Sequence, residues 1–448
     1  MRLLYNGRIV DHNHDVARGW ILIEGDRIAD RGAAEPPAGL LTSCSDAEDL
    51  DGAVMLPGVI DEHVHFREPG MTEKGDIASE SRAAAAGGVT SFFDMPNCRP
   101  PTTSAEAWRR KMELAAEKSV VNYAFFIGAT PDNLDFLATA DYRHIPGIKL
   151  FMGATTGTSA TDSDDFLDRL FAMAPATIAV HAEDETLIAK AREEILSTDS
   201  DPGVERHPDI RTAAACLEAS RKICAIARRH SKRLHLMHVS TASELDLLQS
   251  GDPSVKLITA ETCPQYLLFD RSDYASRGAR VKCNPAIKET SDREALLQAI
   301  VDGRIDTIGT DHAPHLPADK EGGALKAASG MPGVQFALPL MLELVEKLGQ
   351  PLSLVARLMA ANPATVWRVN RRGKLFPGYY ADIAIVRKGM PVEIKDSDVE
   401  SRCGWTPYAG LQTSWRVEQT VVNGVTAYRR GAGADAAVRS AKPVEFGY

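Results

Sequence analysis

Eight short apolar runs lie between residues 57 and 365, and stretches with helical periodicity separate them. Runs of this kind, rich in β-branched residues, are typical of strands that are buried on both faces. Because such strands are parallel and joined by right-handed crossovers, eight of them predict an α/β fold, a (β/α)8 TIM-like barrel. A doubly wound sheet is the alternative that the pattern leaves open. The runs are "GVIDEHVH", "GVTSFFDMP", "VNYAFFIGA", "GIKLFMG", "TIAVHAE", "RLHLMHVS", "KLITAETCP" and "DTIGTDHA".

Both ends of the chain show strand patterns. "LLYNGRIV" places two apolar runs around Asn6-Gly7, and "RVEQTVVNGVTAYRRG" repeats the arrangement around Asn423-Gly424. Asn-Gly between apolar runs is a strong hairpin signal. Neither end has enough strands for a core of its own. We therefore expect residues 1–56 and 366–448 to form one small composite β-sandwich domain, from which a barrel domain of residues 57–365 emerges.

Composition excludes several classes of function. The net charge of −10 and the sequence pI near 5.7 disfavour a nucleic-acid partner. The N-terminus has no apolar run long enough for a signal peptide or a membrane span, so no membrane partner is expected. The seven cysteines are scattered without a C-x-x-C spacing, which argues against disulfides and thiolate zinc sites. We expect a cytoplasmic protein that acts on a small molecule.

Polar side chains follow the apolar runs at the point where each run ends. In a barrel the carboxyl ends of all strands meet at one mouth, where the loops carry the chemistry. These side chains should therefore lie together, although they are far apart in the sequence. They are His63, His65, Asn97, His181, His238 and Asp311.

The spacing of His63 and His65 points to a metal. Residues i and i+2 of a strand face the same way, so one strand offers a divalent ion two imidazole nitrogens. Two core histidines satisfied by hydrogen bonds are the alternative for an isolated H-x-H. The recurrence of His181, His238 and Asp311 at equivalent strand ends favours the metal, because four His and one Asp form a ligand set for zinc or a similar ion.

The remaining histidines receive other interpretations. His235 has the opposite strand parity to its neighbour His238, which predicts a packed structural histidine. The others lie away from strand ends and are expected at the surface: His12, His14, His144, His207 and His230.

Lys149 is unusual because it is a long cation inside an apolar run, "PGIKLFMGATTG". A lysine that reaches out to pair with a carboxylate is the ordinary explanation. Burial, however, lowers the pKa of a lysine, and a neutral amine can react with carbon dioxide. The resulting carbamate could bridge two metals. Two divalent ions facing the carbamate, Asp311 and one hydroxide would keep a single positive charge, which favours a binuclear centre.

Seven motifs occur in order along the chain: "DEHVHFREPG", "DMPN", "KLFMG", "HAE", "LHLMHVS", "NPAIK" and "GTDHAPH". Together they resemble the cyclic-amidohydrolase branch of the metal-dependent amidohydrolase superfamily, most closely its dihydroorotases, over essentially the whole chain. The resemblance implies reversible hydrolysis of L-dihydroorotate to N-carbamoyl-L-aspartate in pyrimidine synthesis. It also implies two divalent ions, with zinc expected, and a metal-bridging hydroxide that attacks the ring amide.

The resemblance also assigns roles to residues. It implies that His63, His65 and Asp311 bind one metal. His181 and His238 would bind the second, with N6-carboxylated Lys149 bridging the two. Asp311 would additionally be the catalytic acid and base, accepting the hydroxide proton and passing it to the departing nitrogen.

Arg67 is the residue that separates candidate substrates. Dihydroorotate differs from dihydrouracil by one carboxylate, which a guanidinium binds through two hydrogen bonds. The resemblance assigns this carboxylate to Arg67, Asn97 and His315, and it places Asn284 near the substrate. An ion pair with Glu68 is the alternative for Arg67, and a turn before Pro285 is the alternative for Asn284.

Other readings stay open. "ETCPQYLLFD" resembles hydantoinases and dihydropyrimidinases more closely, so these enzymes and allantoinase are the alternatives within the branch. A non-catalytic scaffold is disfavoured because every metal ligand is present. "ASGMPGVQ" resembles the substrate loop of the branch. Residues 316–333, polar and rich in glycine, fit either a mobile lid or an exposed loop. A homodimer is the family-level expectation.

Overall fold

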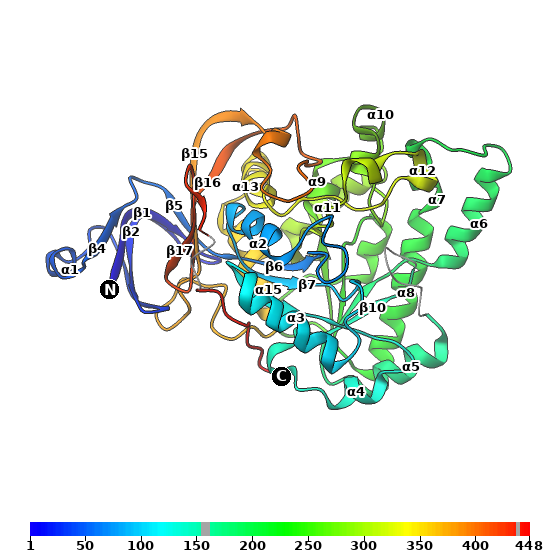
Figure 1. The fold of residues 1–448 in the computed structure, drawn as a ribbon, viewed down its shortest axis with the longest axis horizontal. Coiled ribbons are helices and arrows are strands. Elements are labelled where there is room, and N and C mark those ends of the chain that lie inside the picture. Colours follow the sequence, from blue (N-terminus) through cyan, green and yellow to red (C-terminus); the bar gives the residue numbers. More distant parts are fainter. Residues whose placement is uncertain (154–161, 436–439) are drawn as a thin grey trace.

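The computed structural model describes residues 1–153, 162–435 and 440–448, and its centre is a barrel of parallel strands (Figure 1). The strands form two hydrogen-bonded sheets, one of β6, β7 and β8 and one that runs from β9 to β14. Phe126 alone separates β8 from β9, so these two form one interrupted strand. The strands are β6 (Val59–Val64), β7 (Val89–Asp94), β8 (Asn122–Phe125), β9 (Ile127–Gly128), β10 (Ile148–Phe151), β11 (Ile178–His181), β12 (Leu234–Leu236), β13 (Ile258–Thr262) and β14 (Thr307–Ile308).

The barrel closes between its first and last strands. Val64 forms a parallel bridge with His312, and the His65 N–H donates to the His312 carbonyl at 2.7 Å. These contacts join β6 to the segment after β14. A doubly wound sheet would have two open edges here, so the predicted (β/α)8 barrel is confirmed.

The barrel strands are buried along their whole length, as their apolar sequences require. Trp367 is fully buried and belongs to a hydrophobic cluster that includes barrel residues. Its ring centroid lies 5.1 Å from that of Phe126 and 6.5 Å from that of Phe93, both in edge-on contact. The indole N–H donates to Glu62 at 2.8 Å. The tryptophan therefore packs the core and satisfies a buried carboxylate.

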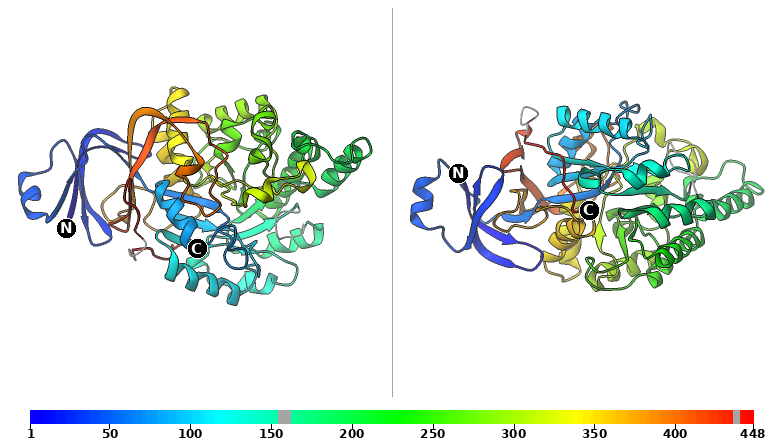
Figure 2. Two further views of the ribbon diagram at one scale, coloured as in Figure 1. Left: turned by 45° about the horizontal axis from the view of Figure 1, so that its top comes forward. Right: turned by 90° about the horizontal axis from the view of Figure 1, so that it is seen from below.

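Helices surround these strands, as the two further views show (Figure 2). Several begin at a side chain that caps the first turn: Asp76 accepts from the N–H of Ser79, and Thr212 from that of Ala215. The longer helices are α2 (Ile77–Ala86), α3 (Ala105–Lys118), α5 (Asp164–Met173), α6 (Glu185–Leu196), α8 (Ala213–His230), α11 (Thr290–Asp302) and α13 (Ala337–Lys347). The short ones are α1 (Ala38–Ser43), α4 (Leu134–Thr139), α7 (His207–Ile210), α9 (Pro264–Leu268), α10 (Asp273–Arg277), α12 (Gly323–Lys326), α14 (Ser353–Ala356) and α15 (Asn362–Val366).

Strands from both chain ends build a third sheet, which has nine strands. β5 pairs in parallel with β1 and antiparallel with β15, which joins the two ends. Leu4, Met55, Ile383 and Val421 share one core, so the composite β unit is confirmed. Its strands are β1 (Arg2–Val10), β2 (Asp15–Glu24), β3 (Arg27–Ala33), β4 (Asp46–Asp49), β5 (Val54–Pro57), β15 (Ile383–Glu393), β16 (Gln412–Val422), β17 (Val425–Arg429) and β18 (Gly433–Ala434).

The two Asn-Gly pairs behave differently. Asn423 and Gly424, with φ of 50° and 83°, form the predicted hairpin turn between β16 and β17. The hairpin predicted at Asn6-Gly7 is wrong, because both residues lie inside β1, where the pairing register shifts. A Cβ on Gly7 would come within 3.0 Å of the Ala53 carbonyl oxygen, so the glycine permits close strand packing.

The end of the chain returns to the barrel. Pro443 forms a bridge with Tyr123 of β8, and the ring centroid of Phe446 lies 5.4 Å from that of Phe93. The last residues therefore pack against the barrel rather than the composite sheet. Among the described residues, no helix has the length and apolar character needed to cross a membrane.

Candidate active site

One cavity at the carboxyl ends of the barrel strands collects the predicted residues. Nine of the ten predicted site residues line it, and the tenth, His315, contacts Arg67 from the side. Phe151, Ala313, Ser329 and Gly330 complete the lining. The nine are His63, His65, Arg67, Asn97, Lys149, His181, His238, Asn284 and Asp311.

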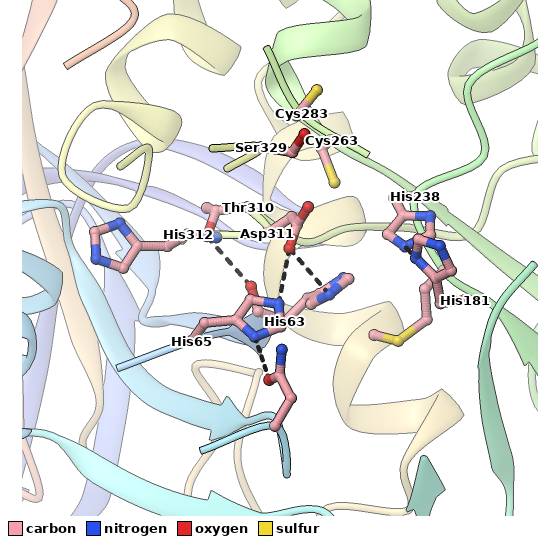
Figure 3. Close-up of polar contacts among 12 residues, drawn as sticks. His63, His65, His181, His238, Cys263, Cys283, Thr310, Asp311, His312 and Ser329 are labelled. Carbon is pink, nitrogen blue, oxygen red and sulfur yellow. Dashed lines mark hydrogen bonds and ion pairs between the residues drawn. The ribbon is translucent and has the colours of Figure 1, made fainter. Parts of the chain in front are cut away.

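The first three predicted metal ligands converge on one point. The Oδ1 atom of Asp311 lies 3.2 Å from Nε2 of His63 and 3.0 Å from Nε2 of His65 (Figure 3). One ligand atom from each lies within 4.8 Å of the others, and all three residues are buried. Two imidazoles and a carboxylate at this separation can hold a divalent ion.

The other two histidines face this group across the cavity. Nδ1 of His181 lies 2.8 Å from Nε2 of His238, and the ring centroids of His63 and His238 are 5.3 Å apart (Figure 3). The five predicted ligands therefore form a pair of adjacent groups, which is the arrangement that a binuclear centre requires.

Lys149 lies on β10 and is fully buried. Its Nζ donates to the sulfur of Met237 at 3.0 Å and lies 4.8 Å from the ring centroid of Phe151. Within the described part of the chain, no carboxylate lies within ion-pair distance of this amine, so the ordinary explanation of a reaching lysine fails. Burial lowers the pKa of Lys149 to about 7, which makes a neutral, reactive amine accessible near neutral pH.

Burial also sets the charge of the histidines. It lowers the pKa of His63 to about 4, and it lowers the pKa values of His65, His181 and His238 as well. Burial raises the pKa of Asp311, but His63 and the hydrogen bond from His65 outweigh it, and the net shift is downward. The site therefore presents neutral nitrogens and an ionised carboxylate, the forms that bind metal ions.

The backbone is strained at three site residues. Arg67, His238 and Asp311 have φ of 69°, 42° and 48°, in the left-handed region that L-residues rarely adopt. Such strain costs about 1–3 kcal/mol per residue and gathers at functional sites. It turns these side chains toward the cavity at the points where their strands end.

Carboxylates and an amide hold the ligand rings from behind. Nδ1 of His63 lies 2.8 Å from Glu261, Nδ1 of His65 lies 2.7 Å from Asn97, and Nε2 of His181 lies 3.0 Å from Glu183. The sequence places Asn97 near the substrate but does not assign Glu183 or Glu261. Glu183 follows the strand that carries His181, in "HAE", whereas Glu261 lies on β13, in "TAET", a strand that carries no predicted ligand; for Glu183 alone that position was an available signal.

Arg67 is almost fully buried beside the metal-ligand group. Its Nε donates to the Pro314 carbonyl at 3.0 Å, and its Nη2 lies 3.1 Å from Nε2 of His315. The alternative of an Arg67–Glu68 pair is wrong, because Glu68 instead accepts from Lys118 and from the N–H of Ile77. Burial lowers the pKa of Arg67 to about 10, so its guanidinium stays charged at neutral pH.

The expected surface position of His207 is wrong. His207 is 3% exposed, and its Nε2 lies 2.9 Å from the Cys283 carbonyl and 3.1 Å from the amide oxygen of Asn284. The helix α7 carries the ring beneath the Asn284 segment, so this histidine supports a residue of the cavity wall. His235 is buried against Thr259 at 2.9 Å, as expected, and the other four histidines expected at the surface are half-buried or exposed.

The segment 316–333 forms one wall of the cavity through Ser329 and Gly330. Lys320 anchors this wall, because its Nζ donates to the carbonyls of Ala328 at 2.6 Å and Gly330 at 2.8 Å. Lys320 is itself 8% exposed. The end of the segment therefore packs against the cavity, while residues 317–318, 321–322 and 325–326 are exposed.

His312 is a site neighbour that the sequence does not assign. It is fully buried, its Nε2 lies 2.8 Å from Glu80, and its Nδ1 accepts from the N–H of Gly333 at 3.1 Å. The ring thereby ties the last barrel strand to α2 and to the segment after Gly330. Its position directly after Asp311 was the only signal in the sequence.

Comparison with known proteins identifies the family. Residues 54–427 match the model of the amidohydrolase family. The chain is 33% identical to an allantoinase of Deinococcus radiodurans over 92% of this chain and 95% of that protein. It is 35% identical to a dihydroorotase of Halobacterium salinarum over 80% and 82%. An L-hydantoinase (dihydropyrimidinase) from Arthrobacter aurescens has a TM-score of 0.90 at 25% identity, covering 99% of both chains. This chain therefore belongs to the amidohydrolase family, and it is a hydrolase with a barrel fold.

Proposed function

We propose that the protein is a dihydroorotase, which reversibly hydrolyses L-dihydroorotate to N-carbamoyl-L-aspartate in pyrimidine synthesis. Arg67 carries the proposal. Its buried guanidinium faces the cavity, and none of the described carboxylates lies within ion-pair distance of it. A buried cation without an anionic partner is costly, and a substrate carboxylate would compensate for it.

The surroundings of Arg67 favour an anionic substrate too. His315 is held neutral, since burial lowers its pKa, and Arg67 and Lys74 lower it further. A second hollow of about 540 Å³ shares Asn284 and Ser329 with the cavity. Among the described residues, four cationic side chains and no acidic one line this hollow, although Arg211 pairs with Glu183 and Lys326 with Asp201. The four are Arg192, Arg211, Lys282 and Lys326.

The residues of the cavity fit two divalent ions, with zinc the expected metal. His63, His65 and Asp311 would hold one, and His181 and His238 the other. We propose that Lys149, carboxylated at Nζ, bridges them, because its amine is buried, lacks a carboxylate partner and lines the same cavity. Bound divalent ions would supply a Lewis acid for the amide oxygen and lower the pKa of an attacking water.

Asp311 is the proposed catalytic acid and base. Its carboxylate lies in the cavity between His63 and His65, with its pKa lowered, so it is ionised and able to take a proton from the attacking water. Delivery of that proton to the ring nitrogen would complete the cleavage of the amide bond. In the reverse direction the same carboxylate would remove a proton from the ureido nitrogen.

Allantoinase is the second candidate. The similarity to the Deinococcus allantoinase, which spans almost the whole of both chains, favours it. An uncharged ring would leave the Arg67 guanidinium uncompensated, however, which places this function behind dihydroorotase.

The deciding experiment is hydrolysis by zinc-loaded protein of L-dihydroorotate, with allantoin, hydantoin and dihydrouracil as parallel substrates. We expect a clear preference for dihydroorotate. Preference for an uncharged ring would refute the substrate while keeping the metal chemistry. No turnover of any ring by protein with bound metal would refute the enzymatic proposal and bring the non-catalytic scaffold forward.

A further inference from the structure

Glu261 connects the two halves of the proposed metal centre. It lies on β13 and is fully buried. One of its oxygens, Oε1, is 2.8 Å from Nδ1 of His63 and 3.1 Å from the backbone nitrogen of His238. His63 lies on β6 and His238 follows β12, so one carboxylate oxygen bonds to a ligand from each group.

The contact with His63 selects the nitrogen that faces the cavity. A carboxylate oxygen accepts hydrogen bonds, so Nδ1 of His63 carries the proton. Nε2 is then the nitrogen with the free lone pair, and it is this atom that lies 3.2 Å from Asp311. A carboxylate behind a histidine in this way fixes the ring tautomer and orientation for metal binding.

The contact with His238 acts on the backbone. His238 has a φ of 42°, a conformation that persists only where surrounding contacts hold it. The hydrogen bond from its N–H to Glu261 is such a contact. Because the ring of His238 lies 2.8 Å from that of His181, a shift of this backbone would also displace the second group.

Gly309 leaves space for the carboxylate of Glu261. A Cβ on Gly309 would lie 2.3 Å from Oε2 of Glu261 and 3.0 Å from the Cβ of His63. Glu62 and His235 also place atoms within 4.8 Å of Glu261. A second buried carboxylate next to Glu62 is costly by itself, and two nearby divalent ions would offset that cost.

We propose that Glu261 is a positioning residue that sets the His63 tautomer and fixes the separation of the two metal groups. The inference rests on the binuclear centre of the proposed function. It does not depend on which ring is hydrolysed.

The test exchanges Glu261 for its neutral isostere. Glu261→Gln keeps the volume but removes the charge and the second acceptor oxygen, and a change of this kind costs about 10- to 100-fold in metal affinity. Glu244→Gln is the matched control, since Glu244 is also buried but bonds to Ser220 at 2.7 Å and Thr241 at 2.8 Å, away from the cavity. Metal content is measured after dialysis against buffered zinc, and the visible spectrum is recorded after loading with cobalt.

We expect Glu261→Gln to lose at least one of two ions at a free zinc concentration that saturates the wild type, and to show an altered cobalt spectrum. Glu244→Gln should match the wild type in both measurements. Wild-type metal affinity and spectrum in Glu261→Gln would overturn the inference, as would an equal loss in both variants. Turnover of dihydroorotate by the wild type tests the proposed function separately. A wild type that binds no metal overturns both.

Discussion

The exchange of Arg67 for glutamine tests the substrate assignment most directly. Arg67→Gln would leave the metal ligands in place and remove the only guanidinium among the described residues that line the cavity. The magnitude follows from the contacts of Arg67. Its Nε and one Nη2 hydrogen are directed at Pro314 and His315, which orients the remaining Nη hydrogens for a carboxylate.

Loss of one partner of a buried charged pair costs about 2–5 kcal/mol. Because about 1.4 kcal/mol corresponds to a factor of ten, kcat/KM for dihydroorotate should fall roughly 30-fold to several-thousand-fold. The assay follows ring opening of dihydroorotate by its ultraviolet absorbance. Zinc content, measured on the same protein, should stay at the wild-type value.

Arg402→Gln is the control, since Arg402 pairs with Asp76 at the protein surface outside the cavity. It should change kcat/KM less than about twofold. If kcat/KM for dihydroorotate fell by less than about threefold in Arg67→Gln, with metal content unchanged, the proposal that Arg67 binds the substrate carboxylate would be refuted. An equal loss on an uncharged ring would show that Arg67 acts on the metal centre instead.

Three further predictions address the chemistry and the fold. Asp311→Asn should lower kcat by about 100- to 10,000-fold, because proton transfer by the carboxylate is lost. The check is kcat measured on wild type and variant at matched zinc content. Unchanged kcat would exclude Asp311 as the catalytic acid and base. Trp367→Phe should destabilise the protein by about 1–3 kcal/mol in urea, because it leaves the Glu62 carboxylate without its 2.8 Å donor. Trp108→Phe is its control, since the Trp108 indole nitrogen has no hydrogen-bond partner among the described residues, and equal effects would contradict the reasoning. Burial lowers the pKa of Lys320 from 10.5 to about 7. Between pH 7 and pH 10.5 the lysine is therefore protonated in the unfolded chain and neutral in the folded chain. Because the unfolded state binds the extra proton, the free energy of unfolding should rise with pH in this range. The urea midpoint of the wild type should therefore gain more between pH 7 and pH 9 than that of Lys320→Met, and equal gains would refute this.

The barrel was predictable because its strands are local patterns. Each apolar run can be recognised from its own sequence, and eight runs favour a barrel over the doubly wound sheet, which only the contacts between Val64 and His312 exclude. The continuous strand that replaces the predicted hairpin at Asn6-Gly7 was not predictable, because packing against Ala53 overrides the local turn signal there. His207 was missed for a similar reason. Its neighbours in sequence are polar, and the Cys283 carbonyl that covers it comes from 76 residues away.

The candidate metal ligands could be predicted because residues at the carboxyl ends of barrel strands lie close together in space. Their supporting partners could not. Glu261 and His63 are 198 residues apart, and nothing in either segment shows that their side chains meet. The sequence identifies the residues that end a strand, while the choice of neighbour depends on barrel closure and on the space beside Gly309.

Substrate choice depends on a different part of the molecule from the metal chemistry. The relatives at 33% and 35% identity include an allantoinase and a dihydroorotase, so overall similarity does not separate the two rings. The metal groups lie at strand ends and would serve either ring. Arg67, His315 and Ser329 instead lie on segments beyond the strands, where Arg67 is held in a strained conformation. A negative substrate group would compensate the buried guanidinium, and of the rings considered only dihydroorotate brings one, which is why the proposal of a dihydroorotase rests on Arg67 and not on the metal groups.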